Sequence, residues 1–235
     1  KIVKEIFPES DLNVLNHLED DGMKIEPDFY APIIPMVLIN GVEGIGTGFS
    51  SKILKYNPID IINYMRCILH KKDIRPTLNP YYEGFKGAII KIGENKWCFK
   101  GQYTIIDDIT VHITDLPIGV WTNIFKQNIE KMMVSSKQGG IVKSYKDMST
   151  DVNIDITIIL YPGELARLLN KIDDVGINMF EKKFKMATIK TTTNQYLFDH
   201  NQQIKKFNMV ENIIDSYYPI RYQLYVKRKA FILKA

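Results

Sequence analysis

The segment from residue 26 to residue 52 reads EPDFYAPIIPMVLINGVEGIGTGFSSK, and it decides how the rest of the chain is interpreted. It joins an apolar run at 33–39, which we expect to be buried, to a loop with glycines at positions 41, 44, 46 and 48. Glycine lets the main chain adopt positive φ and approach another surface closely. One branched hydrophobe, Ile45, stands between two of these glycines. Ile45 therefore either packs inward in a tight turn or projects to enter another molecule, such as a step between stacked base pairs.

The glycine cluster does not match either nucleotide-binding pattern. After Gly44-Ile45-Gly46, the dinucleotide fingerprint requires a third glycine at position 49, where the chain has Phe49. A P-loop requires Gly-Lys-Ser or Gly-Lys-Thr after a four-residue spacer, and the chain has none. We therefore do not expect a nucleotide site in this loop.

Composition sets outer limits on the kind of protein. The chain has 235 residues, 45% of them hydrophobic, which is enough for one large or two smaller domains. Two distant cysteines without a secretory signal indicate a reducing compartment. No apolar run is long enough to cross a membrane, so we expect no membrane partner. The net charge of +4 neither requires nor excludes nucleic acid.

No metal site is predicted. The four histidines are isolated, and Cys67 and Cys98 lack the spacing of a zinc site. Acidic pairs at 20–21, 107–108 and 173–174 are interpreted as solvated turns or helix starts.

The periodicity of the chain predicts an α+β fold. A short helical pattern is formed by Leu12, Leu15 and Leu18, and a loop is predicted at Gly139-Gly140. Longer helices are predicted at residues 58–72, 120–134, 164–172 and 209–235, with Pro219 interrupting the last. Strands are predicted at residues 87–92, 97–106, 109–113 and 152–160, with a hairpin turn at 93–95.

The segment quoted above resembles the central DNA-gate region of eukaryotic-type type IIA DNA topoisomerases. The resemblance rests on Glu26-Pro27, the prolines at 32 and 35, and the run from Met36 to Gly48. The motifs that continue it in the same order are Phe85-Lys86-Gly87, Asp115-Leu116-Pro117 with Trp121-Thr122, Phe184-Lys185-Met186, Leu197-Phe198-Asp199-His200 with Lys205-Lys206, and Arg221-Tyr222 with Tyr225 and Arg228-Lys229.

The resemblance covers essentially the whole chain and implies three parts. Residues 1–30 would be the C-terminal tail of a winged-helix domain. Residues 31–208 would form a mixed α/β tower, or shoulder, domain with a DNA-bending loop. Residues 209–235 would begin a coiled-coil helix towards the exit gate. The nucleophilic tyrosine of the family is expected upstream of Lys1, so no catalytic residue is expected here, and Tyr30 belongs to the Glu-Pro motif.

The implied function is that of one part of an ATP-dependent enzyme. The parent enzyme would pass one DNA duplex through a transient double-strand break in another, using Mg²⁺ and ATP, as a homodimer. Its place would be the nucleus, or wherever DNA replicates if the source is viral. This chain would bind and bend double-stranded DNA without being catalytic itself. The alternative is a non-catalytic DNA-binding or scaffold module that kept the topoisomerase fold.

The resemblance also implies which residues contact DNA, with Ile45 as the intercalating side chain. From the residues alone, Trp121 also fits a core position, the threonines after position 187 fit an ordinary edge strand, and Lys52 fits a solvated surface. Lys205, Lys206 and the run 227–229 are weaker candidates. The predicted DNA contacts are Asn40, Gly44, Gly46, Thr47, Ser50, Lys52, Trp121, Lys185, Thr188, Lys190, Thr191, Thr192, Thr193 and Asn194.

Overall fold

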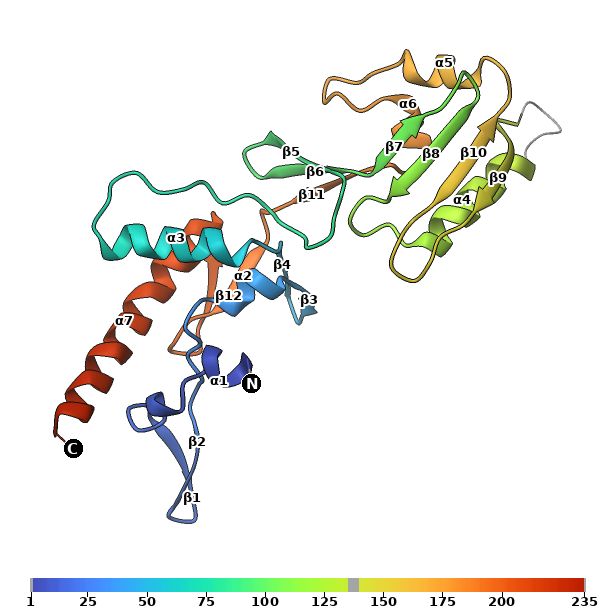
Figure 1. Cartoon of the computed structure of the whole chain (residues 1–235). Helices are drawn as coiled ribbons and strands as arrows, with labels where there is room; N and C mark the ends of the chain where they lie inside the picture. Colours follow the sequence, from blue (N-terminus) through green and yellow to red (C-terminus); the bar gives the residue numbers. More distant parts are fainter. Residues whose placement is uncertain (1, 135–139, 235) are drawn as a thin grey trace. The chain divides into compact units, whose positions relative to one another are not determined.

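The computed structural model describes residues 2–134 and 140–234. The chain divides into two compact units, which we describe separately (Figure 1). The first unit combines residues 1–82 with residues 192–235, and the second unit consists of residues 83–191. This division by compactness differs from the boundaries predicted at residues 30 and 208, which stay predictions. The predicted loop at 139–140 begins at a residue outside the described ranges.

The first unit contains antiparallel hairpins and helices. Its hairpins pair β1 with β2, β3 with β4, and β12 with β13. Its elements are, in chain order, α1 (Ile2–Ile6), the 3-10 turn η1 (Glu9–Asp11), β1 (His17–Asp20), β2 (Met23–Pro27), α2 (Met36–Asn40), β3 (Val42–Gly46), β4 (Phe49–Ile53), α3 (Pro58–Leu69), β12 (Gln195–Phe198), β13 (Ile204–Phe207) and α7 (Val210–Lys234).

The helix predicted after Pro58 is confirmed as α3. The residues that start it are neighbours in the sequence. The side chain of Asn57 accepts a hydrogen bond from the backbone N–H of Ile59 at 2.9 Å, which caps the helix. The interruption predicted at Pro219 is wrong, because α7 is helical over 25 residues with this proline inside it. A proline removes one backbone hydrogen bond, and buried Ile214 and Leu224 on either side hold the helix in place.

The helical pattern predicted at Leu12, Leu15 and Leu18 is also wrong. Only the short turn η1 forms, and the chain enters strand β1 at His17. The His17 ring joins two carbonyl oxygens, with Nδ1 2.7 Å from Ile25 O and Nε2 2.8 Å from Leu12 O. These contacts tie the first residue of β1 to strand β2 and to the turn before the hairpin, and no helical periodicity encodes them.

The apolar run at 33–39 is less buried than predicted. Leu38 and Pro35 are buried, whereas the isoleucines, Met36 and Val37 are half-buried. The reason is that α2 has five residues, so one side of it faces inward. Gly41 ends α2 with φ +69°, and a Cβ there would lie 3.0 Å from the carbonyl oxygen of Ile53. No other residue type fits both constraints without strain.

The second unit is built on two antiparallel sheets. The four-stranded sheet has the order β7-β8-β10-β9, and the three-stranded sheet has the order β11-β6-β5. Its elements are β5 (Ala88–Gly93), β6 (Lys96–Lys100), β7 (Gln102–Ile105), β8 (Thr110–Asp115), α4 (Thr122–Val134), β9 (Val142–Asp147), β10 (Ile156–Leu160), α5 (Glu164–Leu169), α6 (Met179–Lys183) and β11 (Ala187–Thr191).

The predicted strands and helices of the second unit are confirmed with shifted ends, and the α+β fold class is confirmed. The single strand predicted at 97–106 is two strands, because the chain changes sheets at Gly101. A Cβ at Gly101 would lie 2.6 Å from the carbonyl oxygen of Asp115, so only glycine allows this close passage. Helix α4 covers the four-stranded sheet (Figure 1), and Phe125 and Ile129 meet Ile156 and Ile158 in a core without solvent exposure.

Candidate nucleic-acid interface

The glycine-rich segment forms a hairpin rather than an irregular loop. Strands β3 and β4 pair Ile45 with Ser50 and Gly46 with Phe49, and the turn closes at Gly48 with φ +83°. The Ile45 side chain is 95% exposed, the highest value for a large hydrophobic residue in the described part of the chain. The inward-packed alternative for Ile45 is therefore wrong. We call residues 42–53 the wedge hairpin.

The wedge hairpin is supported from one face by aromatic rings. The Phe49 ring packs on Gly46 so closely that a Cβ at Gly46 would lie 2.8 Å from the ring. The same ring lies 6.2 Å from the Tyr196 ring, centroid to centroid. Since directly paired residues point to the same face of a hairpin, Phe49 covers the face opposite to Ile45. This packing stiffens the strand that carries Ile45.

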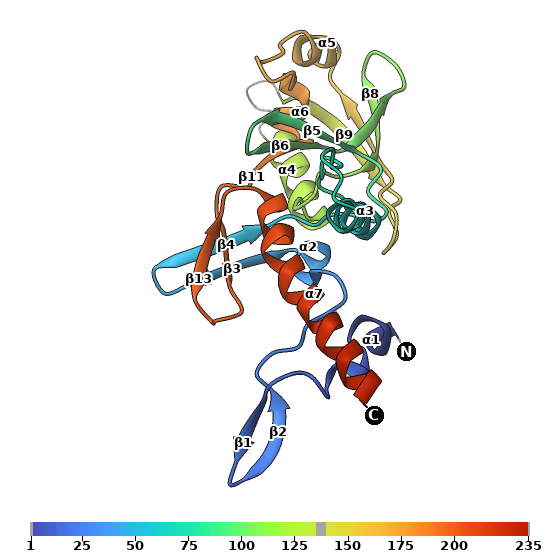
Figure 2. The same ribbon diagram turned by 90° about the vertical axis from the view of Figure 1, so that its left-hand side faces the viewer.

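The outer edge of β4 pairs with the segment before and within β12, so that β3, β4, β12 and β13 lie side by side (Figure 2). The N–H of Lys52 donates to the carbonyl oxygen of Asn194 at 2.7 Å. The Ser51 hydroxyl donates to the carbonyl oxygen of Tyr196 at 2.7 Å and accepts from its N–H at 3.2 Å. The Asn194 side-chain amide donates to the Ser50 hydroxyl. Three predicted contacts, Ser50, Lys52 and Asn194, are thus brought together at the base of the wedge hairpin.

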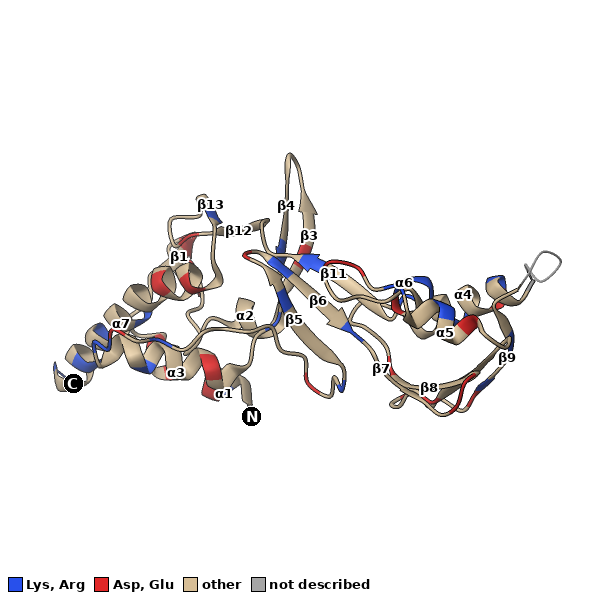
Figure 3. Ribbon diagram, turned by 90° about the horizontal axis from the view of Figure 1, so that it is seen from above, with Lys and Arg blue, Asp and Glu red and all other residues tan. Residues whose placement is uncertain are grey.

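The charges of the wedge hairpin lie at its base, whereas residues 44–51 carry none (Figure 3). There the Lys52 ammonium lies 2.8 Å from the Glu43 carboxylate, with side-chain exposures of 34% and 70%. Asn40, Gly44 and Thr47 are exposed, as the prediction requires of them. Thr193 is exposed, whereas Thr192 is only 5% exposed, so the Thr192 side chain does not lie on the protein surface.

A second group of predicted contacts lies on the second unit, along the edge strand β11. The Thr188 hydroxyl donates to the carbonyl oxygen of Ile118 at 3.3 Å, and a Cβ at Gly119 would lie 3.3 Å from the Lys190 ammonium. The segment before α4 therefore runs beside β11. Trp121, at the end of this segment, is 73% exposed, so its alternative placement in the core is wrong. The edge-strand interpretation of the threonines is confirmed for β11, and their DNA contacts stay predictions.

Lys185 leads into β11 from a strained backbone conformation, with φ +55°. Non-glycine residues adopt this region rarely. The turn that holds it is fixed by Glu181, whose carbonyl oxygen accepts from the N–H of Met186 at 2.7 Å and whose side chain lies 2.9 Å from the Lys100 ammonium.

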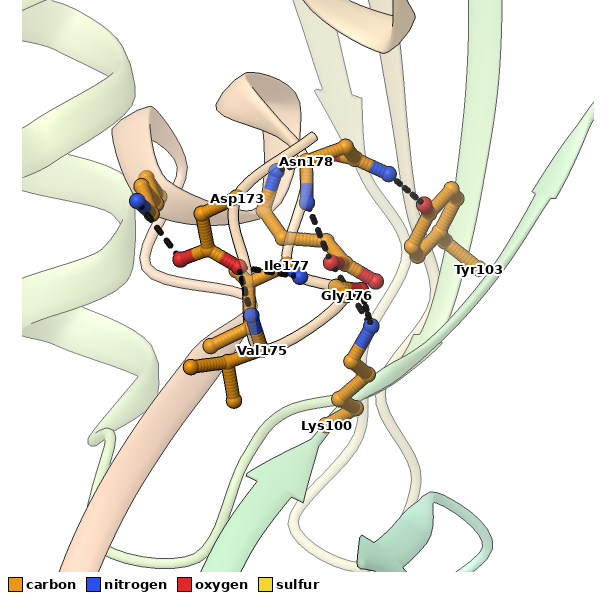
Figure 4. Close-up of polar contacts among 9 residues, drawn as sticks. Lys100, Tyr103, Asp173, Val175, Gly176, Ile177 and Asn178 are labelled. Atoms are coloured by element: carbon orange, nitrogen blue, oxygen red, sulfur yellow. Dashed lines mark hydrogen bonds and ion pairs between the residues drawn. The ribbon is translucent and has the colours of Figure 1, made fainter. Parts of the chain in front are cut away.

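The network around Glu181 extends into the preceding loop (Figure 4). Lys100 points to this loop and donates to the carbonyl oxygen of Gly176 at 2.6 Å. The side-chain amide of Asn178 donates to the Tyr103 hydroxyl at 3.0 Å. Lys182, together with the N–H groups of the loop, holds the pKa of the Asp173 carboxyl below its usual value. No motif or spacing predicted this network, which joins residues up to 81 positions apart.

The acidic pairs lie in turns, as predicted, except that Asp20 is the last residue of strand β1. Asp107 accepts from the N–H groups of Ile109 and Thr110 at 2.9 and 2.8 Å, and these bonds lower the pKa of its carboxyl. Within residues 2–134 and 140–234, no three His, Cys, Asp or Glu side chains are grouped so that they could hold a metal ion. Across these same ranges, none of the helices has the length and apolar character needed to cross a bilayer.

Comparisons with known proteins agree on one family. The model of the family described as the A-subunit of DNA gyrase/topoisomerase IV matches residues 1–235. DNA topoisomerase 2-alpha of Gallus gallus is 36% identical over 234 residues, which is 99% of this chain and 15% of that protein. DNA topoisomerase 2 of Bombyx mori is 37% identical over 232 residues, 98% of this chain and 14% of that protein. The chain thus spans about one seventh of the length of these relatives.

A solved structure supports the same assignment. The crystal structure of the Plasmodium falciparum topoisomerase II DNA-binding, cleavage and re-ligation domain matches with a TM-score of 0.88 and 35% identity. The match covers 97% of this chain and 30% of that chain. With a family model that matches every residue and a solved relative that shares the fold, the chain belongs to the A-subunit family of DNA gyrase/topoisomerase IV.

Proposed function

We propose that this chain binds and bends double-stranded DNA as one part of a type II DNA topoisomerase. The observation that carries the proposal is the 95% exposed Ile45 in the uncharged part of a glycine-rich hairpin. Proteins that kink DNA insert such aliphatic side chains between base pairs. A solvated surface gains nothing from this side chain, whereas an opened base step would bury it.

The energetics require further contacts beside the wedge. Partial unstacking costs a few kcal/mol per step, and bending a 20–30 base-pair site costs on the order of 1–6 kcal/mol more. Burying one isoleucine returns about 1.5–3 kcal/mol. Lys52, Lys185 and Lys190 would supply the rest through phosphates, which fix position without reading sequence. This pattern suits an enzyme that acts at many sites.

We propose the whole enzyme's activity by extension from its relatives. It would pass one duplex through a transient break in another as a homodimer in the nucleus, with ATP and Mg²⁺. Mg²⁺ is commonly held by one or two carboxylates together with substrate phosphates, and we propose no Mg²⁺ ligand among the described residues.

Salt dependence of binding tests the proposal. If Lys52, Lys185 and Lys190 each neutralise one phosphate, affinity for a duplex of about 30 base pairs should fall with a log-log slope of about −2.7. Replacing all three lysines by glutamine should bring the slope close to zero. A matched triple variant at Lys24, Lys71 and Lys72, which are exposed lysines outside the predicted contacts, should keep the wild-type slope.

The same titration separates this function from the scaffold alternative. A scaffold module that kept the fold and lost DNA binding would show no affinity for the duplex at low salt and no slope. That result would refute the proposed function.

A further inference from the structure

We propose that Glu43 weakens the grip of the wedge hairpin on DNA, because its carboxylate competes with a DNA phosphate for the Lys52 ammonium. The inference rests on the proposed function and adds a residue to it. Glu43 would thereby keep binding reversible, which an enzyme that must release its duplex requires. None of the predicted DNA contacts is acidic, and Glu43 is an acidic side chain paired with one of them.

Glu43 and Lys52 are direct partners across the hairpin. They occupy one register position of β3 and β4, two residues before the Ile45 and Ser50 position. Since residues two apart on a strand point to the same face, Glu43 lies on the face that carries Ile45. Its carboxylate oxygen is 2.8 Å from the Lys52 ammonium. The pair is therefore presented with the wedge and would approach DNA together with it.

The depth of the pair matches the position of phosphates beside a wedge. Two residues of strand span about 7 Å, and the minor groove is about 7.5 Å deep. If Ile45 reaches the floor of the groove, Glu43 and Lys52 reach its rim, where the phosphates lie. Lys52 then faces two competing anions. The Glu43 carboxylate must give up the ammonium or remain close to a like charge.

The exchange is feasible because the ion pair is weak. Its side chains are 34% and 70% exposed, and exposed pairs contribute little to stability. The Lys52 backbone is meanwhile held by its hydrogen bond to Asn194 at 2.7 Å. Lys52 can therefore change partners through its flexible side chain while its position on the strand stays fixed.

The variant Glu43→Gln tests the inference, with affinity for the 30 base-pair duplex measured by fluorescence anisotropy at about 0.1 M salt, where surface charges still interact over about 10 Å. We expect about two- to fivefold tighter binding, the size of effect known for exposed ion pairs. The gain should shrink as salt rises. The matched control is Glu19→Gln, because Glu19 faces Lys24 in register on the β1–β2 hairpin of the same unit. This control should leave affinity essentially unchanged.

The Lys52→Gln background shows whether Glu43 acts through Lys52. There the gain from Glu43→Gln should fall below half of its wild-type size. An equal gain in both backgrounds would overturn the inference, since Glu43 would then act by direct repulsion. Unchanged or weaker binding by Glu43→Gln would also overturn it, while leaving the proposed function intact if wild type binds. Failure of wild type to bind would overturn both. Thermal melting of each variant checks that the fold is kept.

Discussion

The substitution Ile45→Ala should separate stability from DNA bending. Because the side chain is 95% exposed, its loss removes almost no buried surface. We expect the free energy of unfolding to change by less than about 1 kcal/mol, the range that strand propensity alone allows. A core isoleucine of the same size would cost about 2–5 kcal/mol.

The effect on bent DNA should be large for the same reason. Insertion would bury nearly the whole side chain, which is worth about 1.5–3 kcal/mol. Each 1.4 kcal/mol is a factor of ten, so the bent complex should weaken by about ten- to a hundredfold. Lysine contacts to straight DNA are unaffected by this change. Total affinity should therefore fall less than the bent population does.

The assay is energy transfer between fluorophores at the two ends of a duplex of about 30 base pairs, a length at which a bend is energetically costly, with affinity read in the same titration. Wild type should shorten the end-to-end distance, and Ile45→Ala should bind without shortening it. Ile74→Ala is the matched control, because Ile74 is 89% exposed in the same unit and lies outside the wedge hairpin. The reasoning is refuted if Ile45→Ala bends DNA as wild type does, or if it destabilises the fold by several kcal/mol.

Three further outcomes are expected. Asp11→Ala should cost about 3–5 kcal/mol in urea unfolding, because the carboxylate lies 2.5 Å from the fully buried Arg221 guanidinium; a loss below about 1 kcal/mol would contradict this. Lys185→Gly should make the log-log salt slope of DNA binding less negative by about 0.9. It should change the free energy of unfolding by less than about 1 kcal/mol, because relief of the left-handed backbone strain at residue 185 offsets the flexibility of glycine. An unchanged slope would show that Lys185 does not contact DNA. Hydrogen bonds from Ser149 and the Lys126 ammonium lower the pKa of Asp147 to about 2, so its contribution is complete above the unfolded pKa near 4 and is lost as pH falls towards 2. Melting temperatures of wild type and Asp147→Asn should accordingly converge between about pH 4 and about pH 2, and a constant difference would refute the assignment.

Local signals in the sequence determined several elements correctly. Pro58 predicted the start of α3, and the turn at residues 93–95 predicted the β5–β6 hairpin. The glycines around Ile45 predicted a special backbone and left two placements for that side chain. Such features depend on contacts within a few residues, so the sequence carries them directly. The family resemblance likewise rests on ordered local motifs.

Only the tertiary structure decided which side chains face solvent and which distant segments meet. Trp121 fits an amphipathic helix or a surface equally well by pattern, and its exposure is set by how the preceding segment runs beside β11. Ser51 bonds to Tyr196 over 145 residues, and Asp11 bonds to Arg221 over 210. Periodicity reports the order of residues along one element, whereas these contacts depend on the path of the whole chain. The Glu43–Lys52 pair likewise depends on tertiary structure, because the register of β3 against β4 places the two charges opposite each other.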